Sequence, residues 1–273
     1  MNDRPSVPTQ HAISADGTTI AYEVTGSGPT VVMVEGALCH RRMGAFDELA
    51  PLLEHQFTVV GYDRRGRGDS GAGSSPYAVQ REVDDLLAVL GAVGADAFVF
   101  GMSAGAALCL EAARQGALSG RLAVYEPPFI LDASHPPDDP GFTDRLRELL
   151  AKGRRTRAVQ AFLRLLGVPA PVVVVLPLLP MWKKLKASAD TLPHDFEIVS
   201  PYRRGVPLPE SHYSAVSSPT LLIAGGRSPD YMRHASEAIA AQIPGAGTAV
   251  LAGQTHEVKA EVIAPVLTSH FLG

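Results

Sequence analysis

Short, almost wholly apolar runs alternate along this chain with segments whose apolar residues recur at helical spacing. Residues 29–34 and 57–62 are runs of the first kind, and residues 79–93 show the helical spacing most clearly. A strand buried on both faces reads as an uninterrupted apolar run, and such strands alternate with helices when crossovers join parallel strands. The pattern therefore predicts an α/β fold with a doubly wound, mostly parallel sheet.

The alternation predicts seven strands and four helices. We expect the strands at residues 18–24, 29–34, 57–62, 97–101, 122–125, 221–224 and 248–251. We expect the helices at residues 76–93, 104–114, 231–243 and 261–271. Ser75 and Pro76 are typical of the N-cap and first position of the first helix.

Between residues 129 and 218 the alternation stops, and the sequence becomes helix-like and rich in proline. An interruption of this length is too long for a loop of a compact domain. It leaves from the carboxyl end of a strand, where parallel sheets bind ligands. We therefore predict a core of residues 1–128 and 219–273 and an inserted helical cap of residues 129–218.

An apolar substrate pocket is expected beneath this cap. Residues 172–179, Met181 and Trp182 are the predicted lining. Met102 is expected to contact the substrate from the core. The sequence leaves open whether Asp195 faces the site or solvent.

Composition limits the choice of partners. The formal charge of −4 over 273 residues is too weak an imbalance to indicate a nucleic acid or an anionic membrane. The first eleven residues contain no apolar stretch typical of a secretory signal. The apolar run at residues 168–182 is too short, and too rich in proline, to span a bilayer. We expect a cytoplasmic protein without a nucleic-acid or membrane partner, in an oligomeric state that the sequence leaves open.

A nucleophile is predicted by GMSAG, residues 101–105, which follows one expected strand and opens a helix. This is the G-x-S-x-G pattern in the context it requires. The two glycines let the strand and the helix approach each other, and Ser103 is lifted above the sheet edge. The helix N-terminus behind it offers free N–H groups to a developing oxyanion.

A second oxyanion donor is expected from EGALCH, residues 35–40, which follows another strand. The N–H group of Gly36 or Ala37 is predicted to pair with that of Ala104. We assign Glu35, as a solvated residue at a strand end, no catalytic role.

His256, in AGQTHEV, is predicted to be the general base. It lies just past the last expected strand and follows Ser103 in the chain with acidic residues between. A serine hydroxyl needs a base within hydrogen-bond reach, and His256 is the histidine that fits by elimination.

GRGDSG, residues 66–71, is a literal G-x-G-x-x-G and leaves a dinucleotide site as an alternative. That motif should open a helix directly, whereas residues 72–75 intervene here. Asp63 and Arg64 are better interpreted as charges that order this loop. We expect no cofactor and no metal.

Five segments together resemble the α/β-hydrolase family over nearly the full chain, in the family's order. They are VVMVEGALCH, GYDRRGRGDSG, FVFGMSAG, TLLIAGGRSP and GQTHEV. The sequence departs from the family at two places. Glu35-Gly36 stands where the family usually has His-Gly, and Ser228 falls on the family's usual acid position.

The resemblance also implies where the acid has moved. In some members, including fungal-type mycotoxin lactonases, the acid follows the sixth strand, which here places it at Glu126 in YEPPF. Pro127 and Pro128 are expected to hold the chain extended there. The order nucleophile, acid, base fits the family. Asp230 is the alternative acid.

The family resemblance implies a serine hydrolase that cleaves a carboxylic ester or lactone of a small hydrophobic substrate. Ser103, Glu126 and His256 would act through an acyl-enzyme. A serine at this position disfavours epoxide hydrolysis and dehalogenation, which use an aspartate nucleophile in this fold. A non-hydrolytic lyase or cyclase, or a ligand-binding module, remains the alternative, and Glu35 is the feature that favours it.

Overall fold

The computed structural model describes residues 7–74 and 76–273. Much of the N-terminal segment in which we expect no secretory signal lies outside these residues. The expected N-cap, Ser75, also lies outside them.

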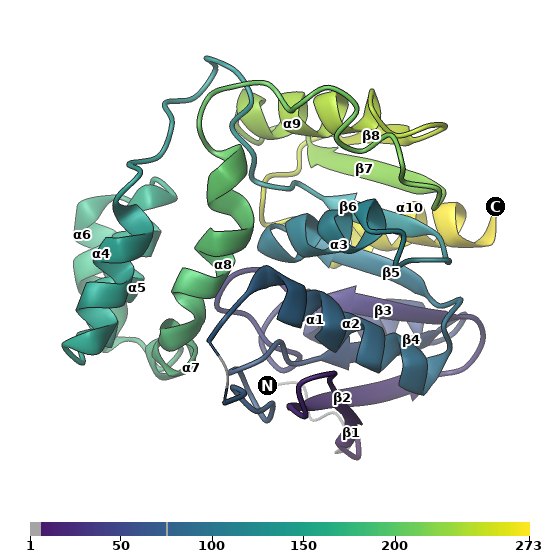
Figure 1. Cartoon of the computed structure of the whole chain (residues 1–273), viewed down its shortest axis with the longest axis horizontal. Helices are drawn as coiled ribbons and strands as arrows, with labels where there is room; N and C mark the ends of the chain where they lie inside the picture. The colour runs from purple at the N-terminus through teal and green to yellow at the C-terminus, as the bar shows by residue number, and fades with distance from the viewer. Residues whose placement is uncertain (1–6, 75) are drawn as a thin grey trace.

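Within the described residues, eight strands form one sheet in the order β1-β2-β4-β3-β5-β6-β7-β8 (Figure 1). Strands β3 to β8 run parallel, whereas β2 is antiparallel to both β1 and β4. The strands span Gln10–Ile13 (β1), Thr19–Gly26 (β2), Thr30–Val34 (β3), Thr58–Tyr62 (β4), Phe98–Met102 (β5), Leu122–Tyr125 (β6), Thr220–Gly225 (β7) and Gly247–Leu251 (β8). The predicted fold class and all seven predicted strands are confirmed.

Strand β3 shows why the apolar runs allowed the strands to be predicted. Val31 and Met33 pack into the hydrophobic cluster on one face of the sheet, and Val32 and Val34 pack into the cluster on the other. Both sides of the strand are therefore buried, and no polar residue interrupts it. Strand β1 was not predicted because, at the sheet edge, only Ala12 of its four residues is buried.

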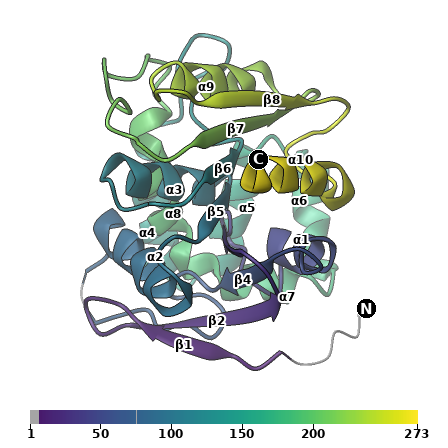
Figure 2. The ribbon, with the colours of Figure 1, turned by 90° about the vertical axis from the view of Figure 1, so that its right-hand side faces the viewer.

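Helices cover both faces of the sheet (Figure 2). Helices α1 (Ala45–Leu53) and α10 (Ala260–Leu272) pack on one face, and α2 (Val79–Val93), α3 (Ala104–Arg114) and α9 (Asp230–Ala240) pack on the other. Helix α1 was not predicted: it is short, and Pro51 lies inside it, which removes a backbone donor and weakens the helical pattern.

Between β6 and β7 the chain forms short helices that lie to the left of the sheet in Figure 1. They are α4 (Phe142–Ala151), α5 (Arg155–Leu165), α6 (Ala170–Val175), η1 (Leu176–Leu178), α7 (Trp182–Ala187), η2 (Ala189–Thr191), α8 (Leu192–Val199) and η3 (Ser200–Tyr202). We call residues 129–218 the insertion; its status as a separate cap stays a prediction. No helix in the described part of the chain is long and apolar enough to cross a membrane.

Helix α2 begins at Val79, three residues later than expected. The ring of Tyr77 stacks on His194 of the insertion, with 3.9 Å between ring centroids. The Tyr77 hydroxyl also donates to Glu82 Oε1 at 2.9 Å. The stacking on the insertion holds Tyr77 ahead of the helix, so the local Ser-Pro signal does not set the start of α2.

Candidate active site

Ser103 lies at the carboxyl end of β5, where the chain turns into α3. Its φ of 55° and ψ of −122° form a conformation that L residues rarely adopt. This turn lifts the side chain above the sheet edge. The first N–H groups of α3 lie behind it without partners inside the helix. The geometry is that of the predicted strand–turn–helix elbow.

The two glycines of GMSAG are required by close packing. A Cβ at Gly105 would lie 2.6 Å from the backbone oxygen of Glu35, and a Cβ at Gly101 would lie 2.6 Å from Cys109 Sγ. Side-chain carbons do not approach other atoms this closely, so larger residues would push α3 away from β3 and β5.

Glu126 and His256 come together at the same sheet edge. Met102 and Tyr125 are register partners in the parallel pair β5–β6, so the residues that follow them leave the sheet side by side. Glu126 Oε2 lies 2.7 Å from His256 Nδ1. The Glu126 carboxylate is fully buried, whereas the His256 side chain is 31% exposed. A proton on Nδ1 would be donated to Glu126, which leaves Nε2 free to accept one.

The backbone at Glu126 differs from the extended conformation that we expected before two prolines. Its φ is 47°, in the left-handed region. Its N–H donates to the Ile223 carbonyl at 3.0 Å, and its Oε1 accepts the Gly225 N–H at 2.7 Å. Three bonds from β7 and His256 therefore hold a backbone conformation that costs of order 1–3 kcal/mol, as at many functional sites.

The loop that carries His256 is tied to β6 by a neighbour of the acid. The hydroxyl of Tyr125 donates to the backbone oxygen of Thr255 at 2.5 Å. This bond fixes the loop next to the buried carboxylate.

The other candidate positions for an acid lie differently. Ser228 has a buried Oγ without a hydrogen-bond partner among the described residues. The carboxylate of Asp230 is 65% exposed, in the first turn of α9, and pairs with Arg233 at 2.9 Å. The described contacts of His256 include Glu126 and not Asp230.

The predicted oxyanion donors face the same space as Ser103. A Cβ at Gly36 would lie 3.2 Å from Ser103 Cβ, so the loop after β3 passes directly over the serine. Gly36, Ala37 and Ala104 all line one cavity together with Ser103.

This cavity has a volume of about 570 Å³ and lies between the sheet edge and the insertion. His256 and Met102 line it. Its apolar wall on the side of the insertion is formed by Phe162, Leu163, Leu165, Leu166, Leu185, Phe196 and Val199.

The side chains that we expected to line the pocket lie elsewhere. Trp182 is buried in the hydrophobic core and is not among the described residues that line the cavity. Residues 172–179 and Met181 are also absent from that lining, and most of their side chains are exposed.

Comparison with known proteins decides the family. A sequence model of the alpha/beta hydrolase family matches residues 26–265, which is most of the chain. The chain belongs to the alpha/beta hydrolase family.

Individual members of this family show how far the likeness reaches. An alpha/beta hydrolase of solved structure from Sphaerobacter thermophilus is 46% identical, with a TM-score of 0.87 over 96% of this chain and 100% of that one. YraK of Bacillus subtilis, an uncharacterized hydrolase, is 28% identical over 156 residues. That match covers 56% of this chain and only 56% of YraK. The enol-lactonase of Burkholderia xenovorans is 16% identical, with a TM-score of 0.69 over 97% of this chain and 100% of that one, and shows the fold alone.

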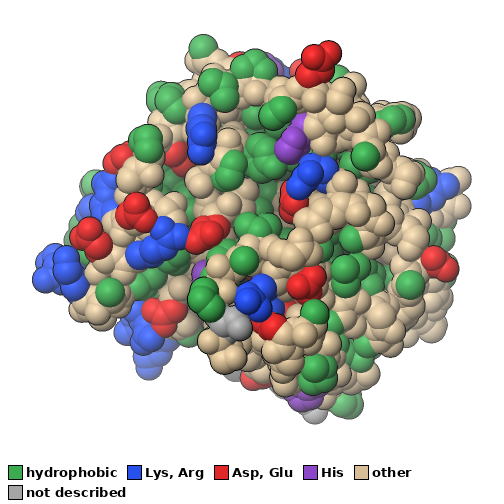
Figure 3. Space-filling view, in the orientation of Figure 1, with side chains coloured by type: hydrophobic (Ala, Val, Ile, Leu, Met, Phe, Trp, Pro, Cys, Tyr) green, Lys and Arg blue, Asp and Glu red, His purple; other side chains and the backbone are tan. Residues whose placement is uncertain are grey.

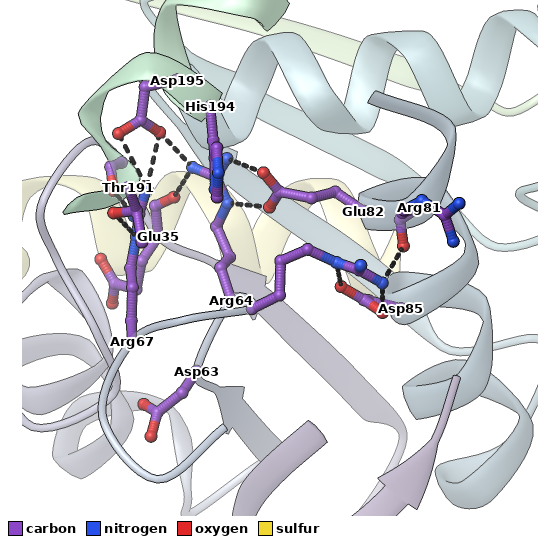
Figure 4. A network of polar contacts seen from close by, with 12 residues as sticks. Glu35, Asp63, Arg64, Arg67, Arg81, Glu82, Asp85, Thr191, His194 and Asp195 are labelled. Atoms are coloured by element: carbon purple, nitrogen blue, oxygen red, sulfur yellow. Dashed lines mark hydrogen bonds and ion pairs between the residues drawn. The ribbon is translucent and has the colours of Figure 1, made fainter. Parts of the chain in front are cut away.

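A buried ion network connects the insertion of this family member to its core (Figure 4). Asp195 of α8 accepts two bonds of 2.7 Å from Arg67 and one of 2.7 Å from Arg64. Arg67 also donates to the backbone oxygen of Gly36 at 2.7 Å, and Arg64 forms a paired contact with Glu82. All four charged side chains are buried. Asp195, which the sequence left unplaced, thus links the insertion to arginines of the core, and one of these, Arg67, also binds the predicted oxyanion loop.

The loop after β4 is ordered by charges, as expected for Asp63 and Arg64. Asp63 is fully buried, pairs with the Arg41 guanidinium, and accepts the N–H groups of Arg41 and Asp69 at 3.0 Å and 2.8 Å. The loop does not open a helix directly, since α2 begins at Val79. This geometry differs from that of a dinucleotide-binding turn.

Glu35 is not solvated at a strand end, as we had expected, but buried. Its carboxylate accepts the N–H of Phe46 at 2.7 Å and that of Ala45 at 3.1 Å, at the N-terminus of α1. Burial raises the pKa of Glu35 from 4.5 to about 7, although these two N–H donors oppose the shift. The residue therefore fixes the start of α1 beside the predicted oxyanion loop.

Asp195→Ala should destabilise the protein by about 3–5 kcal/mol, because it leaves the buried Arg67 guanidinium without a carboxylate. Urea unfolding measures this change. Asp190→Ala is the matched control: Asp190 forms an exposed ion pair with Arg155, and its loss should cost no more than about 1 kcal/mol. Equal costs for the two variants would contradict a stabilising role for the buried network.

Glu35 should make folding stability depend on pH. Its folded pKa lies above its unfolded value, so its contribution is fully present below pH 4.5 and is lost as pH rises through about 7. We expect the wild type to lose roughly 3 kcal/mol relative to Glu35→Gln between about pH 4.5 and 8. Urea unfolding of both proteins across this range measures the difference.

The partly buried His194 acts in the opposite sense in the same range. Burial lowers the pKa of His194 to about 4. Below pH 6.5 the unfolded chain gains a proton on this histidine that the folded chain does not, so the folding stability falls. This contribution is common to both proteins and cancels in their difference. A difference that is constant with pH would contradict the assignment to Glu35.

Proposed function

We propose that the protein is a carboxylic ester hydrolase that uses Ser103, His256 and Glu126 to cleave an ester or lactone of a small hydrophobic substrate. The observation that carries this proposal is the 2.7 Å contact between the buried Glu126 carboxylate and His256 Nδ1, at the sheet edge where Ser103 occupies its strained turn. A buried carboxylate on Nδ1 fixes the imidazole tautomer and stabilises the imidazolium.

The proposed reaction has two halves. Ser103 Oγ attacks the substrate carbonyl carbon while its proton passes to His256 Nε2. The tetrahedral intermediate collapses, the C–O bond to the leaving alcohol breaks, and His256 returns the proton to that alcohol. In the second half His256 takes a proton from water, and the water oxygen attacks the acyl carbon. The bond from that carbon to Ser103 Oγ breaks, His256 returns the proton to Oγ, and the acid is released.

Backbone N–H groups would stabilise the oxyanion in both halves. Ala104 supplies one from the N-terminus of α3, and Gly36 or Ala37 supplies the other. Arg67 binds the carbonyl oxygen of Gly36 and so fixes the orientation of this loop. This contact leaves the adjacent N–H groups to act as donors, which supports their proposed role.

The cavity supports a hydrophobic acyl or lactone ring as the substrate. Its wall on the side of the insertion is mainly apolar, and a volume of about 570 Å³ suits a small molecule. The insertion would thus act as the cap over the site. The enol-lactonase activity named for the Burkholderia protein is consistent with the lactone half of the proposal.

A fluorophosphonate probe tests the proposal against a lyase, a cyclase or a ligand-binding module. Only a serine activated by a base reacts quickly with such a probe. Rapid labelling, together with hydrolysis of members of an ester and lactone panel, supports the hydrolase. Absence of both would overturn it.

Phe162→Ala should shift the preferred acyl chain to longer substrates, because Phe162 lines the cavity and its truncation enlarges it. We expect about a tenfold change in the ratio of kcat/KM between long-chain and short-chain esters. Trp182→Ala is the control, since it removes a buried aromatic side chain outside the lining. It should cost about 3–5 kcal/mol of stability and leave that ratio unchanged.

A further inference from the structure

The apolar run of the insertion lies on the outside of the molecule. Seven of the thirteen exposed large apolar side chains on the described chain fall within residues 166–181. They are Leu166, Val172, Val174, Val175, Leu178, Leu179 and Met181. We call these side chains, together with Lys183, Lys184 and Lys186, the outer face. The elements that carry it pack on one another: α6 lies at the far left of Figure 1, and α7 lies at the lower edge of the insertion, at the foot of α8.

The wider stretch around these residues is strongly basic. Between Glu148 and Asp190 the sequence has no acidic residue and eight basic ones. They are Lys152, Arg154, Arg155, Arg157, Arg164, Lys183, Lys184 and Lys186, and all are exposed. Figure 3 shows Lys and Arg side chains at the left margin, over the insertion, with several Asp and Glu side chains between them.

The lysines of the outer face are available to bind negative charges of another molecule. Lys152 and Arg155 pair with the flanking acids, whereas the described residues provide no ion-pair partner for the three lysines of α7. The whole chain has a formal charge of −4, so the rest of the chain, outside this positive segment, carries a clear net negative charge. We expected no membrane partner because the net charge of the whole chain is weak. That sum does not show that positive and negative charges lie in different parts of the chain.

We propose that the outer face docks the protein on an anionic lipid surface. Apolar side chains flanked by lysines match such a surface: the former enter the acyl boundary, and the latter extend to the headgroups. Each nearby lysine adds attraction to the negative leaflet. The negative remainder of the chain is repelled, which orients the insertion toward the lipid.

Other occupants fit less well. A symmetric dimer through the outer face would place this positive segment against its own copy. Residues 172–181 line no part of the described cavity, so they offer no pocket to an anchoring side chain of a protein partner. A lipid surface needs no such pocket.

Docking would also bring the cavity close to the lipid. Leu166 belongs to the outer face and lines the cavity, and Leu185 of α7 lines it beside the lysines. This placement would let an apolar substrate pass from the acyl layer to Ser103, a consequence that rests on the proposed function. The docking itself does not depend on it.

Co-sedimentation of the full chain with vesicles tests the proposal. Binding should be at least about tenfold tighter to phosphatidylcholine vesicles that contain phosphatidylglycerol than to phosphatidylcholine alone, and should weaken with salt. Lys183→Gln/Lys184→Gln should weaken binding about 30-fold, since each lysine contributes roughly a factor of five. Val174→Ser/Leu178→Ser should weaken it about tenfold or more.

Val250→Ser is the matched control, because Val250 is as exposed as Val175 but lies on β8, outside the outer face. It should bind as the wild type does, and thermal unfolding should show every variant folded. Failure of the wild type to bind anionic vesicles would overturn the proposal. So would equal binding by all variants, or a dimer in sedimentation velocity that Val174→Ser/Leu178→Ser dissociates. None of these readouts uses catalysis, so they are independent of the proposed hydrolase.

Discussion

Ser103→Ala is expected to lower kcat by about four orders of magnitude or more on any ester that the wild type hydrolyses. Without Oγ no acyl-enzyme bond forms, and only the oxyanion donors and substrate binding remain to accelerate attack by water. Steady-state kinetics measures the loss. Mass spectrometry of tryptic peptides after fluorophosphonate treatment should show the added mass on the wild-type peptide that contains Ser103, and none in the variant.

Ser103→Gly separates catalysis from folding at the same position. It should be as inactive as Ser103→Ala, yet it relieves the strain of a side chain at a φ of 55°. Glycine loses more backbone entropy on folding, which offsets part of that gain. We therefore expect the glycine variant to be at least as stable as the alanine variant in urea. Labelling at another residue, or full activity in either variant, would contradict the role of Ser103.

The parts of the fold that were predictable are those whose burial has a local sequence pattern. Strand β3 could be predicted because both of its faces are buried. GMSAG could be recognised because close packing around the turn requires both of its glycines. Strand β1 and helix α1 lack such a pattern: one is a mostly exposed edge, and the other contains Pro51.

Most of the buried ion network could not be predicted from the sequence, because its partners are distant in the chain. Asp195 is 131 residues from Arg64 and 128 from Arg67, and no spacing rule connects residues that far apart. The available signal was three arginines in GYDRRGRGDSG, too many for a short turn without buried partners. Glu35 was misplaced for a different reason: its donors lie nearby in the chain but belong to α1, which was not predicted.

Hydrophobic composition also does not say which surface a segment faces. The run at residues 172–179 was expected in the pocket because it is apolar, yet exposed apolar side chains are common on folded proteins. In the structure Val173 is buried while Val174 and Leu178 are exposed, so the run divides between the two environments. Only its packing on α5 and α7 decides this.

Glu126→Gln is expected to lower kcat by about three to four orders of magnitude at unchanged fold. The glutamine has the same shape, and one amide oxygen remains to accept a bond from either the Gly225 N–H or His256 Nδ1. It carries no charge to stabilise the imidazolium, and its NH₂ group can donate to Nδ1, which would place the histidine proton on Nε2. In that tautomer His256 cannot accept the proton of Ser103. Steady-state kinetics at saturating ester, with thermal unfolding as the check on folding, measures the effect.

Asp230→Asn is the matched variant, because it makes the same chemical change at the other candidate acid. Asp230 is mostly exposed and lies in the first turn of α9, where a carboxylate stabilises a helix by about 0.3–1 kcal/mol. Its removal should cost that much stability and leave kcat nearly unchanged. Glu126 has a different position: it is fully buried, in a left-handed backbone conformation held by β7, with its second oxygen on His256. A large loss of kcat in Asp230→Asn with a small one in Glu126→Gln would show that the loop after β7 still supplies the acid, and that Glu126 only supports the histidine loop.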